Sequence, residues 1–493
     1  MKSILLYLSL ILCLNQYTLA QTDTSSNISP FINGTILDEN QISIPYVNII
    51  DLNTGKGTIS NVNGDFSINT NFLNDTNIIR FQCIGYKTKD YRIGELKKMS
   101  NILLRQNIYN LDEILILSEI PDPKKIIKRI LENKDLNYNT STKKEEVFIR
   151  ERSTADILKL KLDYNKSNIE VITPEMLQIV EKHTPKNIQS YSDLLTNIYI
   201  KKDNLKINPI RIVELKGKDV KQLEMLEDAF TKLIKETKDN EYWRVKTGII
   251  GTKIPPPDND SLETNASNKK NTNQYKEKAK QYLEFATFKN KKQWEFLHKI
   301  DKYNFEIIGG TSINDENVYV IDFSPKGKGL YEGRLYVSIE SSALIKADYK
   351  YAPNKVGIDI KAFGFSQTNT NFSGSIYFEK NENNYNLKYL SLQDHNKYGA
   401  KRKVAFQKKK KRFLINKKLK EIEISVDLIM KEKISIELLI IDHSKISESE
   451  FNKIIEEQYI NTTYVNQFNK DLWKDYITIE PTQEMKEYKN TKP

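Results

Sequence analysis

The chain has 493 residues, with 76 lysines and arginines against 65 aspartates and glutamates, a formal net charge of +11 and two cysteines. Because one cysteine lies in a predicted export signal, a disulfide framework is excluded and stability must come from core burial. The positive charge would ordinarily favour a nucleic-acid partner, but export from the cytoplasm argues against one.

The first twenty residues have the pattern of a secretory signal peptide. Met1–Ala20 combines a positive end at Lys2 with the apolar run Ile4–Leu14 and small residues before the cleavage point. The apolar run is too short for a comfortable membrane span, and no other segment reaches about 18 apolar residues. Cys13 is not preceded by a small residue, so we expect no lipid anchor and a mature chain that begins near Gln21.

The stretch from 33 to 68 has the pattern of a small β-sandwich, with short apolar strands broken by Gly, Asn and Asp turns. Val47 and Ile49 share one strand face. Gly57 and Gly64 are expected at turns, and Phe66 is expected in the core. Cys83 alternates in phase with Phe81, which predicts a small buried hydrophobe and not a reactive thiol.

Several motifs in this region occur in a fixed order. The matching residues are Gly34, Ile36 and Asp38, then Pro45, Val47 and Ile49, then Gly57, Thr58, Ser60, Asn61, Gly64 and Phe66, then Phe81, Gly85 and Tyr86, and finally Leu111, Glu113, Ile114 and Ile116. Residues 30–118 therefore resemble the carboxypeptidase D regulatory-like domain, a transthyretin-type (prealbumin-like) sandwich. The resemblance implies a structural or interaction module that is abundant in Bacteroidetes-type envelopes, and it implies no peptidase activity.

Residues 121–290 are predicted to form a mixed α/β segment. Asp122 as N-cap and Pro123 at the first helical position begin a short amphipathic helix, with an apolar stripe at Ile126, Ile127, Ile130 and Leu131. We expect this helix to dock the sandwich onto the C-terminal part of the chain. Further along, the pattern predicts two strands in Glu145–Ile172 around Ser153–Leu158, helical spacing in Leu177–Leu195, an amphipathic helix at Val220–Lys238, a strand at Glu241–Ile254 and a long exposed loop at 255–273.

From residue 294 to 480 the apolar period is two, which predicts an antiparallel β-meander that forms one larger domain with residues 140–290. The predicted strands are Asn304–Ile308, Val318–Phe323, Gly333–Ile339, Leu344–Tyr351, Gly357–Phe365, Phe372–Glu379, Tyr385–Leu392, Lys401–Phe406, Arg412–Ile415 and Glu421–Met430. Hairpin tips are expected at Pro325–Gly329 and Lys380–Asn384. The predicted fold class is mainly β with some α, an N-terminal sandwich followed by a β-meander with packing helices.

One face of the meander is apolar, through Val318, Val320, Leu335, Val337, Ile339, Leu344 and Ile358. This face must be buried by helices or by a ligand. Helices at Val220–Lys238 and Lys276–Phe285 could cover it fully and give an ordinary core, or they could leave a pocket for an acyl chain. Strands with intervening helices also resemble the half-barrel of lipoprotein-carrier proteins, in architecture only.

The densest basic run is Lys401-Arg402-Lys403 with Lys408–Arg412, interleaved with Val404, Phe406 and Phe413. The pattern predicts a solvated strand edge guarded by lysines, with a patch for lipid A phosphates or anionic lipid as the alternative. The 27 tyrosines fit ordinary cross-strand packing, and sugar stacking is the alternative.

No constellation for catalysis is visible. The four histidines, His183, His298, His395 and His443, lie outside any metal-ligand spacing, and neither a phosphate-binding loop nor a nucleophile elbow occurs. We therefore predict no catalytic, cofactor-binding or metal-ligating residues and no cofactor.

These observations predict a non-catalytic exported protein of the periplasm or the periplasmic face of the outer membrane, a scaffold or binding module that acts through contacts with an envelope protein partner. We expect no nucleic acid and no transmembrane segment after signal removal. Alternatives are a periplasmic carrier of a lipid or other apolar ligand, a carbohydrate-binding module, and a hydrolase with an unrecognised site. A TonB-dependent receptor is disfavoured, because the strands present cannot make the roughly twenty-two of such a barrel.

Overall fold

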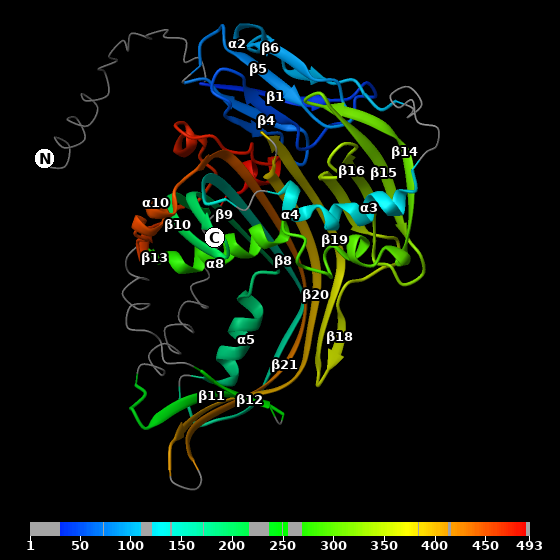
Figure 1. Cartoon of the computed structure of the whole chain (residues 1–493). Coiled ribbons are helices and arrows are strands. Elements are labelled where there is room, and N and C mark those ends of the chain that lie inside the picture. Colours follow the sequence, from blue (N-terminus) through cyan, green and yellow to red (C-terminus); the bar gives the residue numbers. More distant parts are fainter. Residues whose placement is uncertain are drawn as a thin grey trace, which may run out of the picture.

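The computed structural model describes residues 30–489, apart from positions 72, 171, 249 and 383 and the segments 110–120, 139–140, 216–235, 255–268 and 413–415. A small sandwich lies across one face of a large curved sheet, and several helices lie on the other face (Figure 1). The predicted mainly β fold class is confirmed. The predicted signal peptide, the closing strand of the sandwich at Leu111–Ile116 and nearly all of the predicted helix at Val220–Lys238 lie outside the described residues.

The N-terminal sandwich packs two sheets, β4-β1-β7 and β3-β2-β5-β6, around a core of its own. Its elements are β1 (Phe31–Leu37), β2 (Asn48–Asp51), β3 (Gly57–Ile59), β4 (Asp65–Asn69), β5 (Ile78–Gln82), β6 (Lys89–Arg92), α2 (Ile93–Leu96) and β7 (Asn101–Leu103). Phe66 is buried and meets Phe81 edge to face at 5.3 Å between ring centroids, as the alternation predicted. Cys83 is buried as predicted.

The two glycines of the sandwich hairpin differ in role. Gly64 has a φ of +78°, which confirms the predicted turn. The turn predicted at Gly57 is wrong, because this residue begins β3. A Cβ atom at Gly57 would lie 2.1 Å from the carbonyl oxygen of Ile49, so the close approach of β2 and not a turn requires glycine there.

The large sheet has the strand order β14-β15-β16-β17-β19-β20-β21-β8-β9-β10-β23, with β11, β12 and β18 attached at its side. Its strands are β8 (Lys143–Ser167), β9 (Asn187–Lys201), β10 (Asn204–Leu215), β11 (Glu241–Thr247), β12 (Ile250–Ile254), β14 (Tyr303–Ile313), β15 (Glu316–Pro325), β16 (Tyr331–Ser338), β17 (Leu344–Tyr351), β18 (Asp359–Ala362), β19 (Phe365–Asn381), β20 (Asn384–Lys410), β21 (Lys417–Lys445) and β23 (Thr463–Val465). A separate pair consists of β13 (Lys269–Asn271) and β22 (Tyr459–Asn461).

Several predicted strand limits are wrong, because three very long strands run through them. The two strands predicted in Glu145–Ile172 are the single strand β8. The break predicted between residues 392 and 401 lies inside β20, and both predicted ends of the strand Glu421–Met430 lie inside β21. Continuous pairing among these three strands satisfies the backbone, and bulges absorb the irregular positions. The strand predicted at Gly357–Phe365 is instead β18 with a turn into β19, where Phe363 and Gly364 have positive φ.

The helical elements are α3 (Pro123–Glu132), α4 (Lys134–Asn137), α5 (Pro174–His183), α8 (Thr272–Phe285), α9 (Glu295–His298), η2 (Ile300–Lys302), α10 (Glu448–Lys453), η3 (Lys470–Trp473) and α11 (Gln483–Glu487). Asp122 caps α3 by accepting from the Lys124 amide, and Ile126, Ile127 and Ile130 are buried, as predicted. The docking role predicted for this helix is wrong, because α3 packs on α9 and β14 of the large sheet.

Three further predicted element boundaries, between residues 177 and 273, differ from those in the structure. The helical spacing of Leu177–Leu195 continues only to His183, and β9 begins at Asn187. The strand predicted at Glu241–Ile254 is the hairpin β11–β12, which turns at Gly248 with a φ of +60°. The loop predicted at 255–273 is wrong at its end, because β13 and the start of α8 occupy its last residues.

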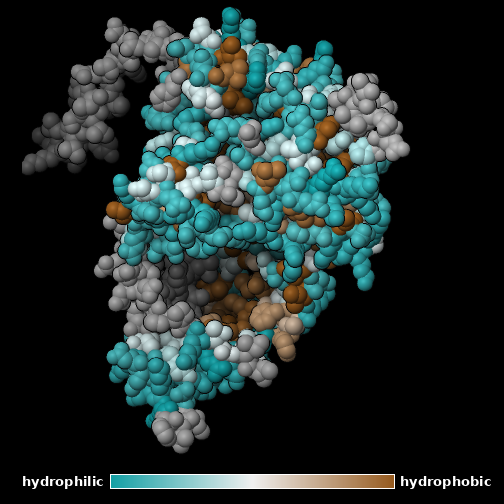
Figure 2. Space-filling model, in the orientation of Figure 1, coloured by the Kyte–Doolittle hydropathy of each residue, from teal (hydrophilic) through white to brown (hydrophobic). Residues whose placement is uncertain are grey.

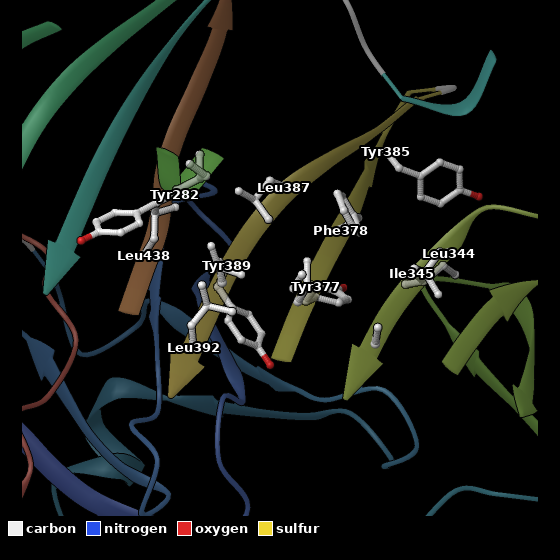
Figure 3. Packing of buried hydrophobic residues seen from close by; sticks show 14 of the residues in the cluster. Tyr282, Leu344, Ile345, Tyr377, Phe378, Tyr385, Leu387, Tyr389, Leu392 and Leu438 are labelled. Atoms are coloured by element: carbon white, nitrogen blue, oxygen red, sulfur yellow. The ribbon is translucent and has the colours of Figure 1, made fainter. Parts of the chain in front are cut away.

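The main core has parts on both faces of the large sheet: one part lies under the helices, and the other joins outer-face residues such as Tyr389 to Ile59 and Ile84 of the sandwich (Figure 3). We call this helix-covered side the inner face and the side that meets the sandwich the outer face. Leu392 and Leu438 belong to the inner face, whereas Tyr389 of the outer face packs on Tyr46 of the sandwich, with ring centroids 5.1 Å apart. Val318, Val320, Leu335, Val337 and Leu344 are fully buried and Ile339 is half-buried, but the prediction that they share one face is wrong. Leu335 and Val337 lie opposite Ile321 and Tyr319, whereas Val318 and Val320 lie opposite Ser338 and Tyr336 and so point to the other face of the sheet. Ile358 is exposed, so its predicted core position is wrong.

Candidate functional site: an apolar hollow on the inner face

Beyond the helix-covered core and a short polar stretch, the inner face of the sheet is apolar again. Across strands β20, β21 and β8, Tyr398 lies opposite Met430, which lies opposite Ile157. Ala400 lies opposite Leu428, which lies opposite Leu160. Directly opposed residues point to the same face of a sheet. Together with the next residue of this face on β21, we call them the hollow residues: Ile157, Leu160, Tyr398, Ala400, Val426, Leu428 and Met430.

The outer face of the same strands is charged. Lys159 and Lys161 of β8 alternate with the apolar residues, and so does Asp427 of β21. Lys159 pairs with Asp427 at 2.6 Å, and Lys401 of β20 is exposed. Alternation of this kind is typical of a sheet that is solvated on one face and covered on the other.

The hollow residues lie between two core clusters without joining either. One cluster is the main core, and the other gathers Ile169, Ile172, Leu177, Trp243 and Ile422 around α5. Each hollow residue is only half-buried, and within the described part of the chain none packs into a core cluster. Figure 2 shows an apolar hollow at this place, between α8 and the β11–β12 hairpin. The sheet therefore presents an apolar surface that its described helices leave partly uncovered.

The end of the hollow nearest the main core is polar. Ser153 donates to Glu432 at 3.3 Å, and Asn396 donates to Asp394 at 3.2 Å. Burial, followed by the charge of Glu432 and a hydrogen bond to it, raises the pKa of Tyr398 above its ordinary value. These carboxylates therefore have neutral donors as partners at this end.

The apolar surface continues to the edge of the sheet through the β18–β19 hairpin. Ile360 lies opposite Gln367, which lies opposite Tyr398, so all three share the inner face. Ile360 is 57% exposed, and Phe363 at the turn is 71% exposed. The hairpin thus carries exposed apolar side chains beside the hollow.

On the outer face, a cavity of about 340 Å³ lies between the sandwich and the large sheet. Ile49, Arg150 and Trp473 are among its lining residues. The Arg150 guanidinium donates to both carboxylate oxygens of Asp193 at 2.8 Å and to the carbonyl of Ile479 at 2.8 Å. This buried network ties the C-terminal segment to β8 and β9 at the wall of the cavity.

The structure changes the interpretation of the basic run. The predicted strand edge is wrong for residues 408–410, because β20 pairs there with β11 on one side and with β21 on the other. Residues 401–403 pair with β21 but lie between the pairings of β20 with β19 and with β11, so no described strand is paired with them on that side. Lys401 and Lys403 are exposed on the outer face, whereas Lys408 is buried and pairs with Glu241 at 2.9 Å. Arg402 projects from the inner face. Phe413 lies outside the described residues.

The histidines that were considered as metal ligands do not gather into a site, and two of them contact backbone carbonyls. His298 Nε2 lies 2.7 Å from the carbonyl of Phe288, and His183 Nδ1 lies 2.8 Å from that of Ile179. Across residues 30–489 outside the gaps, no three His, Cys, Asp or Glu side chains gather as a metal site. In the same part of the chain, no helix combines the length and apolarity needed to cross a bilayer.

Sequence reasoning did not single out the hollow residues. The alternation Leu160, Leu162, Tyr164 against Lys159, Lys161, Asp163 was the available signal. That alternation shows that one face of β8 is apolar. It does not show that β8 lies beside β21 or that the described helices cover only part of this face.

Comparison with known proteins places the sandwich in a family. Residues 32–116 match the model of the CarboxypepD_reg-like domain, so this part of the chain is such a domain, as the motifs predicted. The TonB-dependent receptor P39 of Formosa agariphila is 27% identical over 108 residues, which cover 22% of this chain and 10% of the receptor. The chain thus spans about a tenth of the length of this curated relative.

Two solved structures cover most of the chain. A putative outer membrane lipoprotein-sorting protein domain from Vibrio parahaemolyticus is 10% identical, with 67% of this chain and 98% of that chain covered and a TM-score of 0.20. A chain of the MucA/MucB complex of Pseudomonas aeruginosa is 9% identical, with 62% of this chain and 94% of that chain covered and a TM-score of 0.15. TM-scores this low support no conclusion about fold or function.

Proposed function

We propose that this chain is a non-catalytic binding protein of the cell envelope that holds an apolar chain in the hollow. The observation that carries the proposal is the row of half-buried apolar residues on β8, β21 and β20 that joins neither neighbouring core cluster. A concave apolar surface that stays partly exposed to water is typical of a ligand-binding site, because a ligand that covers it removes apolar area from water.

The energetics favour an elongated ligand. Each CH₂ group that a ligand buries contributes about 0.8 kcal/mol, so an acyl chain along the strands gains more than a compact molecule does. The hollow extends along β21 from Met430 to Val426 and onto β8 through Ile157 and Leu160. This shape suits an acyl chain better than a flat sugar ring, which would need an aromatic platform.

The envelope location rests on the CarboxypepD_reg-like domain, on its likeness to part of a TonB-dependent receptor and on the signal pattern of the first twenty residues. The sandwich lies on the outer face of the sheet, away from the hollow. It is therefore free to contribute contacts with an envelope partner while the large sheet holds the ligand.

Native mass spectrometry of gently extracted protein tests the proposal, because a bound lipid adds its mass to that of the chain. Binding of N-phenyl-1-naphthylamine, a neutral apolar fluorophore, gives a quantitative second measurement. Leu428→Glu places a charge in the hollow and should weaken dye binding at least tenfold, since burial of an unpaired carboxylate is costly.

Ser425→Glu is the matched control, because residue 425 lies on the same strand but faces outward. It should leave dye binding unchanged. A protein without bound lipid whose dye affinity is the same in the wild type and in Leu428→Glu would overturn the proposal.

A further inference from the structure

A guanidinium group lies at the end of the hollow remote from the acidic side chains. Arg402 is opposite Val426 on β21, so its side chain projects from the same face as the hollow residues. Its Nε and Nη1 atoms are buried, and no described residue accepts a hydrogen bond from either. Burial of such donors without an acceptor costs free energy, which an incoming acceptor would recover.

Neighbouring residues hold this guanidinium in place without neutralising it. Its central carbon lies 4.5 Å from the ring centroid of Phe365, a cation–π distance. The turn at Gly248 approaches so closely that a Cβ atom there would lie 3.0 Å from Nη2. Thr247 fixes this turn by donating to the carbonyl of Lys403 at 3.2 Å. The cation is thus positioned by an aromatic ring and by backbone.

The acidic residues nearby serve other partners. Glu423 and Asp427 on β21 belong to the outer face, where lysines contact them. Glu181 of α5 accepts from the backbone amide of Leu162. Asp394 is eight residues away along β20, about 26 Å at the usual strand rise. Among the described residues, Arg402 therefore has no carboxylate partner and places a cation at one end of an apolar surface.

We propose that the hollow takes an amphipathic ligand whose anionic head group, a carboxylate or a phosphate, binds Arg402 while its acyl chain lies along the hollow residues. This inference rests on the proposed function and specifies its ligand class. The planar fork of guanidinium N–H groups matches two oxygens of either anion, and such charge-assisted bonds are strongest where water is excluded.

Competition against bound N-phenyl-1-naphthylamine tests the head-group preference. Palmitate and lysophosphatidate supply the two anions, and hexadecanol supplies a neutral chain of similar length. Arg402→Gln should weaken palmitate or lysophosphatidate about tenfold to a hundredfold, because it removes charge-assisted hydrogen bonds, and it should leave hexadecanol unchanged. Arg402→Lys should retain part of the anion affinity, and Lys401→Gln on the outer face should change nothing.

The outcomes separate this inference from the function on which it rests. A loss confined to lysophosphatidate identifies the phosphate as the natural head group, and a loss confined to palmitate identifies the carboxylate. If all three ligands compete equally and Arg402→Gln changes none of them, the anionic head group is refuted while the apolar carrier stands. If neither the dye nor hexadecanol binds the wild type, the proposed function itself has failed.

Discussion

Replacement of Arg150 by methionine should destabilise the large sheet far more than replacement of an exposed arginine with the same pairing geometry. Arg150 and Asp193 are 6% and 1% exposed at their side chains, and two parallel hydrogen bonds of 2.8 Å join them. Methionine fills a similar volume but leaves Asp193 as a buried carboxylate without its cation. It also removes the donor that the carbonyl of Ile479 uses.

The magnitude follows from the burial of the pair. Breaking a buried ion pair from one side costs about 3–5 kcal/mol, because the remaining charge stays desolvated. Arg334→Met is the control, since Arg334 and Asp322 make the same bidentate contact at 37% and 40% exposure. Exposed pairs contribute about 0–1 kcal/mol, so this control should cost no more than that.

Urea unfolding followed by far-ultraviolet circular dichroism measures both losses as free energies of unfolding. The double variant R150M/D193L should recover at least about 2 kcal/mol of the single loss, because an apolar pair replaces an unpaired charge. Equal and small losses in Arg150→Met and Arg334→Met would refute the reasoning, since they would show that water or another cation reaches Asp193.

Three further outcomes follow from individual side chains. Phe66→Ala in the sandwich core should cost about 3–5 kcal/mol in urea unfolding, and a loss below about 1 kcal/mol would contradict its buried contact with Phe81. Burial alone would raise the pKa of Glu421, but hydrogen bonds from Lys418, Gln407 and Lys166 outweigh it and lower this pKa from 4.5 to about 2. Its contribution to stability should thus be complete above about pH 4.5 and lost as the pH falls toward 2, and Glu421→Gln should flatten this part of an acid unfolding curve. Burial raises the pKa of the Cys83 thiol, so a thiol reagent should label it only after denaturant is added, and rapid labelling of the native protein would contradict its burial.

The features that could be predicted from the residues alone are those with a local cause. The ordered motifs identified the sandwich, Gly64 marked a turn that needs positive φ, and Asp122 and Pro123 marked the start of α3. Alternation likewise placed Phe66 in a core. Each of these features follows either from a residue's own backbone preference or from the hydrophobic periodicity of the residues around it. Both causes are independent of distant parts of the chain.

The candidate site depends on contacts between distant segments, so it became visible only in the folded chain. Leu160 lies opposite Leu428 although 268 positions separate them, and Arg402 turns inward from a run that looked like a solvated edge. Alternation assigns side chains to two faces, but it does not say which strand lies alongside or how far helices extend over either face. Because the hollow is defined by that pairing and by the limit of that cover, its residues look in sequence like ordinary core.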